Sequence, residues 1–298
     1  MGKPRVRTAP DGIVVIDKPA GMTSHDVVAR LRRSCGTRAV GHAGTLDPMA
    51  TGVLVLGIER ATKLLGHLTS STKSYDATVR LGMATNTEDA DGEVTAVTPA
   101  SHLTDGQIEL AAQGFRGPIM QVPSAVSAIK VNGVRSYKRA RAGETFELPA
   151  RAVTIDSIRI TGIRREAECV DVDLSVSCSA GTYIRALARD LGAALRVGAH
   201  LTALRRTAAG CFSLEDAQQL PGIGGQAPQT IPLRDVLARE FDVVALDAEE
   251  AALVRHGMPI RTGKVRTGLT GLIDVDGSVL ALAEAVQGYW RYAAVFSA

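Results

Sequence analysis

Residues 41–52 read GHAGTLDPMATG, the most informative stretch of this 298-residue chain. The loop holds three glycines, one proline and a single carboxylate, Asp47, so its backbone can come close to a ligand. Asp47 precedes Pro48 and can be a turn residue whose carboxylate accepts local backbone N–H bonds. It can also be a nucleophile or base, which must be ionised and free of strong local partners. A nearby Arg would keep it ionised even in a desolvated pocket, and the residues alone leave both interpretations open.

Patterns on either side of this loop predict alternating strands and helices. Before it, an apolar strand at 12–17 and a turn at 18–21 precede a helix with Ser24 as its N-cap. After it, we expect a strand at 53–58 and a helix over about 61–68. The loop therefore lies between ordered elements, where catalytic residues are often found.

The rest of the chain predicts an α+β fold in which antiparallel strands dominate. The long alternating runs are typical of strands, and Thr104 with Gln107 forms a capping box at the start of a helix. We expect strands over 75–81, 153–160 and 170–177, helices over 104–114 and 182–195, and a hairpin of 269–274 with 278–282 around Asp276-Gly277. These elements indicate a mixed body of about 240 residues followed by a small strand-rich C-terminal unit.

Composition places the chain among ordinary soluble globular proteins. It has 45% hydrophobic and 22% charged residues, and no window approaches 18 consecutive apolar residues. The basic N-terminus leads into no apolar segment, so no secretory signal is expected and the predicted location is the cytoplasm. The cysteine spacing fits neither a CxxC pair nor a zinc framework, so we expect four reduced thiols: Cys35, Cys169, Cys178 and Cys211.

The distribution of charge is more informative than its sum of +3. Residues 1–211 carry 27 Lys and Arg against 20 Asp and Glu, whereas residues 212–250 carry 2 against 8. The first two-thirds of the chain therefore suits a polyanion, and the acidic stretch is typical of a solvated connector.

The loop resembles the catalytic motif of the tRNA pseudouridine synthase B (TruB) family, which isomerises uridine 55 in the T-loop of tRNA. Further blocks follow in the family's order. They are DKPAGMTS at 17–24, KSY at 73–75, CSAGTYIR at 178–185, and GAHL with LRR within 198–206. Several ordered blocks at compatible spacing are far more specific than the loop alone.

The resemblance implies three catalytic residues. Asp47 matches the family's catalytic Asp, which attacks the uridine so that the base detaches, turns and reattaches through C5. Arg185 matches the Arg that pairs with this carboxylate, although a surface Arg in the first turn of a helix is the simpler expectation. Tyr75 matches the Tyr that stacks on the target base and helps to remove the C5 proton, although a lone strand Tyr is more often a core residue. The rearrangement needs no cofactor, and no metal site is expected.

The resemblance also implies residues that bind the substrate. Tyr183 and Leu204 would line the pocket, and His42 would fill the gap left by the extruded base. Residues 123–141 resemble an RNA-clamping thumb, although a solvated basic helix face would have the same composition. The expected substrate-binding set is His42, Tyr183, Leu204, Lys18, Lys130, Lys138, Arg139 and Arg141.

By resemblance, residues 1–238 form a pseudouridine synthase catalytic domain with a mixed, mainly antiparallel sheet. Residues 239–298 resemble a PUA-type RNA-binding module. The expected partner is tRNA, bound at its T-loop and elbow, and the target uridine must be flipped out to reach Asp47. No protein partner is implied, and a monomer is expected.

Three other functions compete with this one. A tRNA-folding chaperone could use the same scaffold, alone or alongside catalysis, without needing Asp47, Tyr75 or Arg185. A small-molecule hydrolase would need a second catalytic carboxylate or a metal site. A pseudouridine synthase for other RNA sites would share the catalytic residues. Attack by Asp47 at C1′, attack at C6 and a glycal route also remain open.

Overall fold

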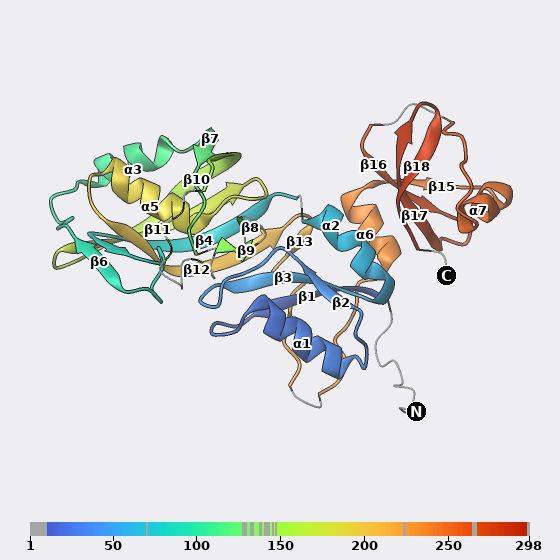
Figure 1. Ribbon diagram of the computed structural model, residues 1–298, viewed down its shortest axis with the longest axis horizontal. Coiled ribbons are helices and arrows are strands. Elements are labelled where there is room, and N and C mark those ends of the chain that lie inside the picture. The colour runs from blue at the N-terminus through green and yellow to red at the C-terminus, as the bar shows by residue number, and fades with distance from the viewer. Residues whose placement is uncertain are drawn as a thin grey trace.

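The computed structural model describes residues 11–69, 71–126, 130–131, 134–136, 139, 144, 146, 148–222, 225–263 and 267–296. Within them the chain forms one long twisted sheet with helices packed on it and a smaller strand-rich unit at the C-terminal end (Figure 1).

The long sheet is mixed and mainly antiparallel, as predicted. Its order is β14-β1-β3-β12-β4-β11-β10-β7, and among the described strands of this sheet only β1 with β14 and β12 with β3 pair in parallel. The strands are β1 (Gly12–Lys18), β3 (Thr51–Ile58), β4 (Lys73–Leu81), β7 (Gly117–Gln121), β10 (Arg151–Glu166), β11 (Cys169–Cys178), β12 (Ala199–Ala209) and β14 (Gln218–Gln219). Two short strands add to it, β2 (Val40–Ala43) on β3 and β13 (Phe212–Ser213) on β12.

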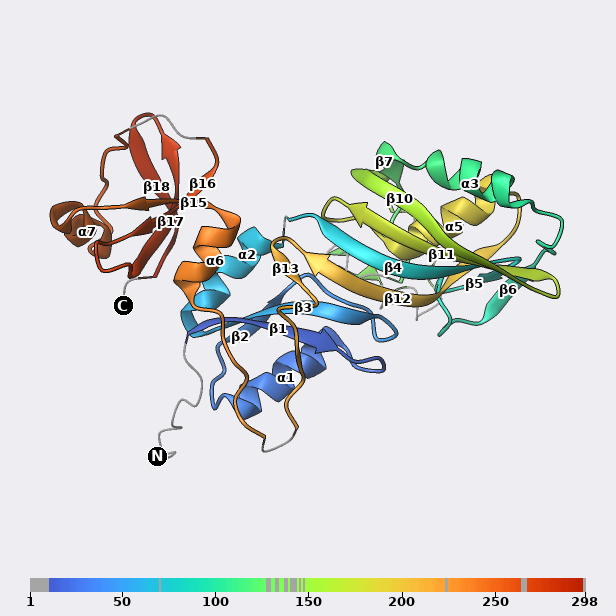
Figure 2. The same ribbon diagram turned by 180° about the vertical axis from the view of Figure 1, so that it is seen from behind.

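Helices cover the sheet in two places. Helices α3 (Asp105–Gln113) and α5 (Ile184–Ala194) lie over the part formed by β4, β10 and β11, and α1 (Ser24–Ser34) packs beside β1 and β3 (Figures 1 and 2). Each of these elements contributes buried side chains to one apolar cluster, whereas Ile13 and Val53 of β1 and β3 belong to a second. The loop before β3 lies within this region, so the fold places its carboxylate on a rigid support.

Helix α1 starts at Ser24, as the sequence predicted, but its cap is the preceding residue. Its N-cap is Thr23, whose hydroxyl accepts from the Asp26 backbone N–H while the Asp26 carboxylate accepts from the Thr23 N–H. The assignment of Ser24 as N-cap is therefore wrong. Buried Ser24 instead exchanges hydrogen bonds with the backbone N–H and C=O of Leu46, at 2.9 and 3.1 Å, and so ties the helix to the loop.

The other helices follow the sequence pattern with local differences. The capping box of Thr104 and Gln107 is confirmed at the start of α3. The helix expected over 61–68 is a 3-10 turn, η1 (Glu59–Leu64), followed by one turn of α-helix, α2 (Leu65–Leu68). The short strands β5 (Met83–Thr85), β6 (Val94–Val97), β8 (Lys130–Val131) and β9 (Val134–Arg135) were not predicted.

The C-terminal unit is a second sheet of order β15-β16-β17-β18. Its elements, with the helix α6 that precedes it, are α6 (Leu233–Glu240), β15 (Asp242–Ala245), α7 (Ala248–Arg255), β16 (Leu269–Ile273), β17 (Val279–Val286) and β18 (Tyr289–Val295). The predicted hairpin is confirmed, because β16 pairs with β17 in antiparallel orientation. In its turn, the Asp274 carboxylate accepts from the N–H groups of Asp276 and Ser278. The boundary expected at residue 238 falls in the last turn of α6 and stays a prediction.

The unit packs against the main body, where Arg60 and Lys63 of η1 donate to the carbonyls of Phe296 and Val295. Phe296 and Leu282 join the apolar cluster that contains Ile13 and Val53. All four cysteines are free, as expected. None of the helices in the described part of the chain is long and apolar enough to cross a membrane.

Candidate active site

The GHAGTLDPMATG loop is shorter than its sequence suggested, because its first residues belong to β2. The remaining turn depends on two glycines with positive φ, Gly44 at +87° and Gly52 at +97°. A Cβ at Gly52 would lie 2.1 Å from the backbone oxygen of Arg206. Only glycine fits there, since both the dihedral angle and the close approach exclude a side chain.

Asp47 lies at the tip of this turn, on the wall of a cleft of about 310 Å³. Its Oδ2 atom is 2.9 Å from Nε of Arg185, and 36% of its side chain remains exposed. In the described part of the chain, no local backbone N–H donates to this carboxylate. The turn-residue interpretation is therefore not supported, and the carboxylate is available to a ligand.

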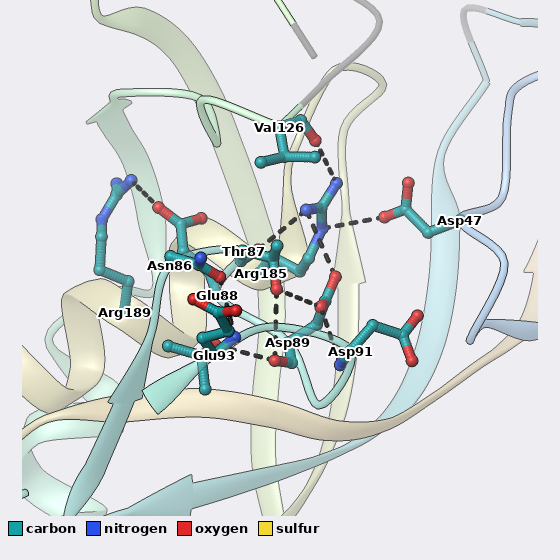
Figure 3. Close-up of polar contacts among 11 residues, drawn as sticks. Asp47, Asn86, Thr87, Glu88, Asp89, Asp91, Glu93, Val126, Arg185 and Arg189 are labelled. Carbon is teal, nitrogen blue, oxygen red and sulfur yellow. Dashed lines mark hydrogen bonds and ion pairs between the residues drawn. The ribbon is translucent and has the colours of Figure 1, made fainter. Parts of the chain in front are cut away.

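Arg185 is buried, with only 5% of its side chain exposed, so the surface-helix alternative is wrong. It joins three segments (Figure 3). Nη1 donates to the Thr87 carbonyl at 2.9 Å and Nη2 to the Val126 carbonyl at 2.7 Å. Nη1 also lies 3.4 Å from Oδ2 of Asp89. Both carboxylates therefore share one guanidinium.

Asp89 was not predicted as part of the site from the sequence. It belongs to the turn between β5 and β6, where its Oδ1 accepts from the Thr87 hydroxyl at 2.5 Å and the Asp91 N–H at 3.2 Å. The side chain is buried and directed toward Arg185 (Figure 3). No sequence signal connected residues 89 and 185, because only the tertiary fold brings them together.

Burial raises the pKa of Asp47 above its ordinary value. Arg185 opposes this shift, nearby Asp89 adds to it, and Lys18 opposes it weakly. The sequence-based expectation of an Arg beside this carboxylate in a desolvated pocket agrees with the arrangement of Asp47 and Arg185. A carboxylate with a raised pKa is a better base and nucleophile than an exposed Asp once it is ionised.

Tyr75, Tyr183 and Leu204 line the same cleft, as the sequence predicted. Tyr75 is 7% exposed, and burial raises the pKa of its hydroxyl although Arg206 opposes the shift. Tyr183 precedes α5, and the side-chain amide of Gln121 binds its backbone N–H and C=O at 2.8 and 3.1 Å. The cleft thus combines aromatic and aliphatic surface with charged groups, as a pocket for a base requires.

His42 and Lys18 do not line the cleft. His42 lies on β2, with its ring 5.5 Å from that of His25 in an edge-to-face arrangement, and burial lowers its pKa. Lys18 is fully buried, and its ammonium donates to the carbonyls of Met22, Pro19 and Pro48 at 2.6, 2.9 and 3.3 Å. We therefore reassign Lys18 from direct substrate contact to support of the loop beside Asp47.

The thumb segment is described only in part. Lys130 and Arg135 are opposite each other in the β8–β9 ladder, so a continuous basic helix is not present there. Arg139 pairs with Glu144 at 2.6 Å and stacks over the ring of Phe146. Lys138 and Arg141 lie outside the described residues, and RNA contacts of this segment stay a prediction.

Two further cleft residues were not predicted as part of the site. Arg206 is 1% exposed and donates to the carbonyls of Val53 at 2.7 Å, Gly44 at 3.1 Å and Thr45 at 3.4 Å. Lys73 lies two residues before Tyr75 on β4, hence on the same face of the strand. The KSY spacing could have revealed Lys73, whereas nothing in the sequence marks Arg206 as buried.

Comparison with protein families gives three matches along the chain. Residues 32–184 match the TruB family pseudouridylate synthase N-terminal domain. Residues 185–225 match the tRNA pseudouridylate synthase B C-terminal domain, and residues 241–297 match the C-terminal domain of tRNA pseudouridine synthase II.

Curated relatives are similar over nearly the whole chain. A tRNA pseudouridine synthase B from Mycobacterium sp. (strain KMS) is 56% identical over 273 residues, which cover 92% of each chain. One from Thermobifida fusca (strain YX) is 52% identical over 291 residues, covering 96% of this chain and 99% of the relative. Among solved structures, a chain in the crystal structure of a Cbf5-Nop10-Gar1 complex has a TM-score of 0.70 at 26% identity. This match covers 96% of the present chain and 84% of the other.

Proposed function

The chain belongs to the TruB family of pseudouridylate synthases, and we propose that it isomerises uridine 55 in the T-loop of tRNA, with Asp47 as the catalytic nucleophile. As a member of this family it is an isomerase of the pseudouridine synthase type. The position in the RNA and the roles of individual residues are our inferences from the motifs and from the site.

The observation that carries the proposal is the Asp47–Arg185 pair on the wall of the cleft. One exposed edge of the carboxylate can reach a ribose or a base, while Arg185 fixes its orientation from behind. Tyr75, Tyr183 and Leu204 provide the apolar surface against which an extruded uracil would stack. The reaction then needs one ionised carboxylate and one enclosed base, and both requirements fit this geometry.

A hydrolase fits the site less well. Such an enzyme needs a second carboxylate or a metal to activate water across the substrate. The second carboxylate here, Asp89, is buried, pairs with Arg185 and accepts a hydrogen bond within its own turn. Among the described residues, no group of three His, Cys, Asp or Glu side chains could hold a metal ion.

The remaining parts of the proposal concern RNA binding. Extrusion of a stacked base costs a few kcal/mol, which contacts elsewhere on the RNA must offset. We assign these contacts to the thumb, including Lys130, Lys138, Arg139 and Arg141, to His42 beside the loop, and to the PUA-like C-terminal unit. Because extrusion loosens the tRNA elbow, a folding role can accompany catalysis. We expect a cytoplasmic monomer.

Release of tritium from C5-labelled uridine in an unmodified tRNA transcript tests the proposal. Wild type should release tritium without added metal or cofactor, because C5 loses its proton when it bonds to C1′. Asp47→Asn should bind the transcript with nearly normal affinity and release none. If both proteins bind and neither releases tritium, the catalytic proposal fails for this RNA, and the folding role becomes the better account.

A further inference from the structure

Two cations on the cleft wall, Lys73 and Arg206, form no ion pair within the described part of the chain. Lys73 is 7% exposed and bonds only to backbone carbonyls, as does Arg206 apart from its contact with the Tyr75 hydroxyl. Arg185 on the same wall is instead engaged by two carboxylates. A desolvated cation without a counter-ion is costly, and its presence in a cleft suits a ligand that carries negative charge.

The geometry of Lys73 leaves it able to bind such a ligand. Its ammonium donates to the carbonyls of Thr69 at 2.8 Å and Ser71 at 2.6 Å. An ammonium has three N–H donors, so one remains after these two bonds. A Cβ built on Gly44 would lie 3.6 Å from both Cε of Lys73 and Nη1 of Arg206, so the two cations converge on the loop that carries Asp47.

We propose that Lys73 is a further catalytic residue, which donates to a carbonyl oxygen of the uracil and stabilises the negative charge that the ring acquires during isomerisation. This inference rests on the proposed function. If Asp47 attacks C1′, the electron pair of the N1–C1′ bond stays with the base and spreads over N1, O2 and O4. After the ring turns, C5 bonds to C1′ as the Asp47 carboxylate leaves. C5 then gives up its proton, and N1 takes one from solvent.

The same charge arises on the other routes. Attack at C6 pushes an electron pair onto C5 and O4, and a glycal route also releases the base as an anion. A fixed cation beside the ring therefore helps whichever route operates. Because the charge is absent from bound uridine, the contact strengthens only toward the transition state, so it should affect turnover much more than binding.

The surroundings of Lys73 give the proposal a pH signature. Burial and the charge of Arg206 on β12 lower the pKa of Lys73 to about 8, while Cys178 on β11 and Glu240 on α6 oppose the shift. The side chain is thus charged at neutral pH and loses its proton as the pH rises through about 8. An arginine at this position would stay charged throughout this range.

The experiment measures single-turnover tritium release and tRNA affinity for wild type, Lys73→Met and Lys73→Arg. Arg159→Met, on the exposed side of β10, is the control for loss of one positive charge outside the cleft. Lys73→Met should be slowed by about 10²-fold with Kd nearly unchanged, as for loss of one donor to a developing anion. Lys73→Arg should recover most of the rate and lose the decline above pH 8, and Arg159→Met should behave as wild type.

Several outcomes would overturn the inference, and one of them would overturn the proposed function as well. A weaker Kd with an unchanged rate in Lys73→Met would place Lys73 on an RNA phosphate, which is charged in every state. If Lys73→Arg is slow, or shows the same decline above pH 8, Lys73 has only a structural role, as a donor to the carbonyls of Thr69 and Ser71. If wild type releases no tritium, the proposed function itself is wrong. If wild type and Lys73→Met release tritium at equal rates, only this inference is wrong.

Discussion

Replacing Arg185 with methionine should move the acid side of the pH–rate profile to higher pH, whereas replacing Asp89 with asparagine should move it to lower pH. Catalysis as proposed needs ionised Asp47, so the rate falls as the pH falls through the pKa of this carboxyl in the folded protein. Arg185 lowers this raised pKa and Asp89 raises it. The two substitutions remove opposite influences, so their effects on the profile must have opposite signs.

The burial of Arg185 and its carboxylate partners determines how much each substitution changes the stability of the protein. The side chains of Arg185 and Asp89 are 5% and 8% exposed, so their charges are largely shielded from water. Removal of one partner from a buried pair costs about 3–5 kcal/mol in the free energy of unfolding. We expect Arg185→Met to lower the free energy of unfolding by an amount in this range, mainly because it leaves the buried Asp89 carboxylate without its ion-pair partner. Asp47 is more than a third exposed and contributes less.

The assay is single-turnover tritium release across a pH series, with urea unfolding of each variant to confirm that it is folded. Asp171→Asn is the matched control, because Asp171 is also a buried carboxylate paired with an arginine, Arg80 at 2.7 Å, but does not line the cleft. The reasoning fails if Arg185→Met and Asp89→Asn shift the acid side in the same direction. It also fails if Asp171→Asn shifts it as far as they do.

Two further predictions concern RNA binding and the loop. Loss of charge at Lys138, Arg139 and Arg141 together should weaken tRNA binding. The slope of log K against log salt, measured by titration at several salt concentrations, should become smaller by about 0.7–0.9 for each phosphate that is no longer neutralised. An unchanged slope would mean that the thumb does not contact the RNA. Gly52→Ala should destabilise the protein by several kcal/mol in urea unfolding, because its Cβ would meet the Arg206 carbonyl at 2.1 Å and φ is +97°. Gly66→Ala, where a Cβ meets nothing within 4 Å, is its control and should be nearly neutral.

Local patterns in the sequence predicted most of the fold. The alternation of Val153–Ile160 and Val170–Ser177 predicted the long antiparallel pair, and the capping box at Thr104 located the start of α3. The exact cap of α1 was missed because Thr23 and Ser24 are both good N-caps. The choice between them depends on Leu46, which binds the Ser24 hydroxyl from a distant part of the chain.

The candidate site was predicted where its residues carry a recognisable motif and missed where they act through tertiary contacts. Asp47, Tyr75, Tyr183, Arg185 and Leu204 all line one cleft, as expected. Asp89 was not connected to the site because its partner, Arg185, lies almost a hundred residues away in the sequence. Lys18 was predicted to contact the substrate, and Arg206 was not predicted as part of the site. Charged side chains are expected at the surface, yet both of these are buried and donate to backbone carbonyls.

These buried cations explain how a flexible, glycine-rich loop can hold a carboxylate in one place. Residues on both sides of Asp47 are anchored: the Ser24 hydroxyl holds Leu46, while the Gly21 N–H and the Lys18 ammonium hold the Pro48 carbonyl. Arg206 holds the carbonyls of Gly44 and Thr45. A carboxylate fixed in this way needs little reorganisation to attack, whereas one on a mobile loop would first have to be ordered. The glycines let the loop approach the substrate, and the desolvated cations supply the rigidity that the glycines remove.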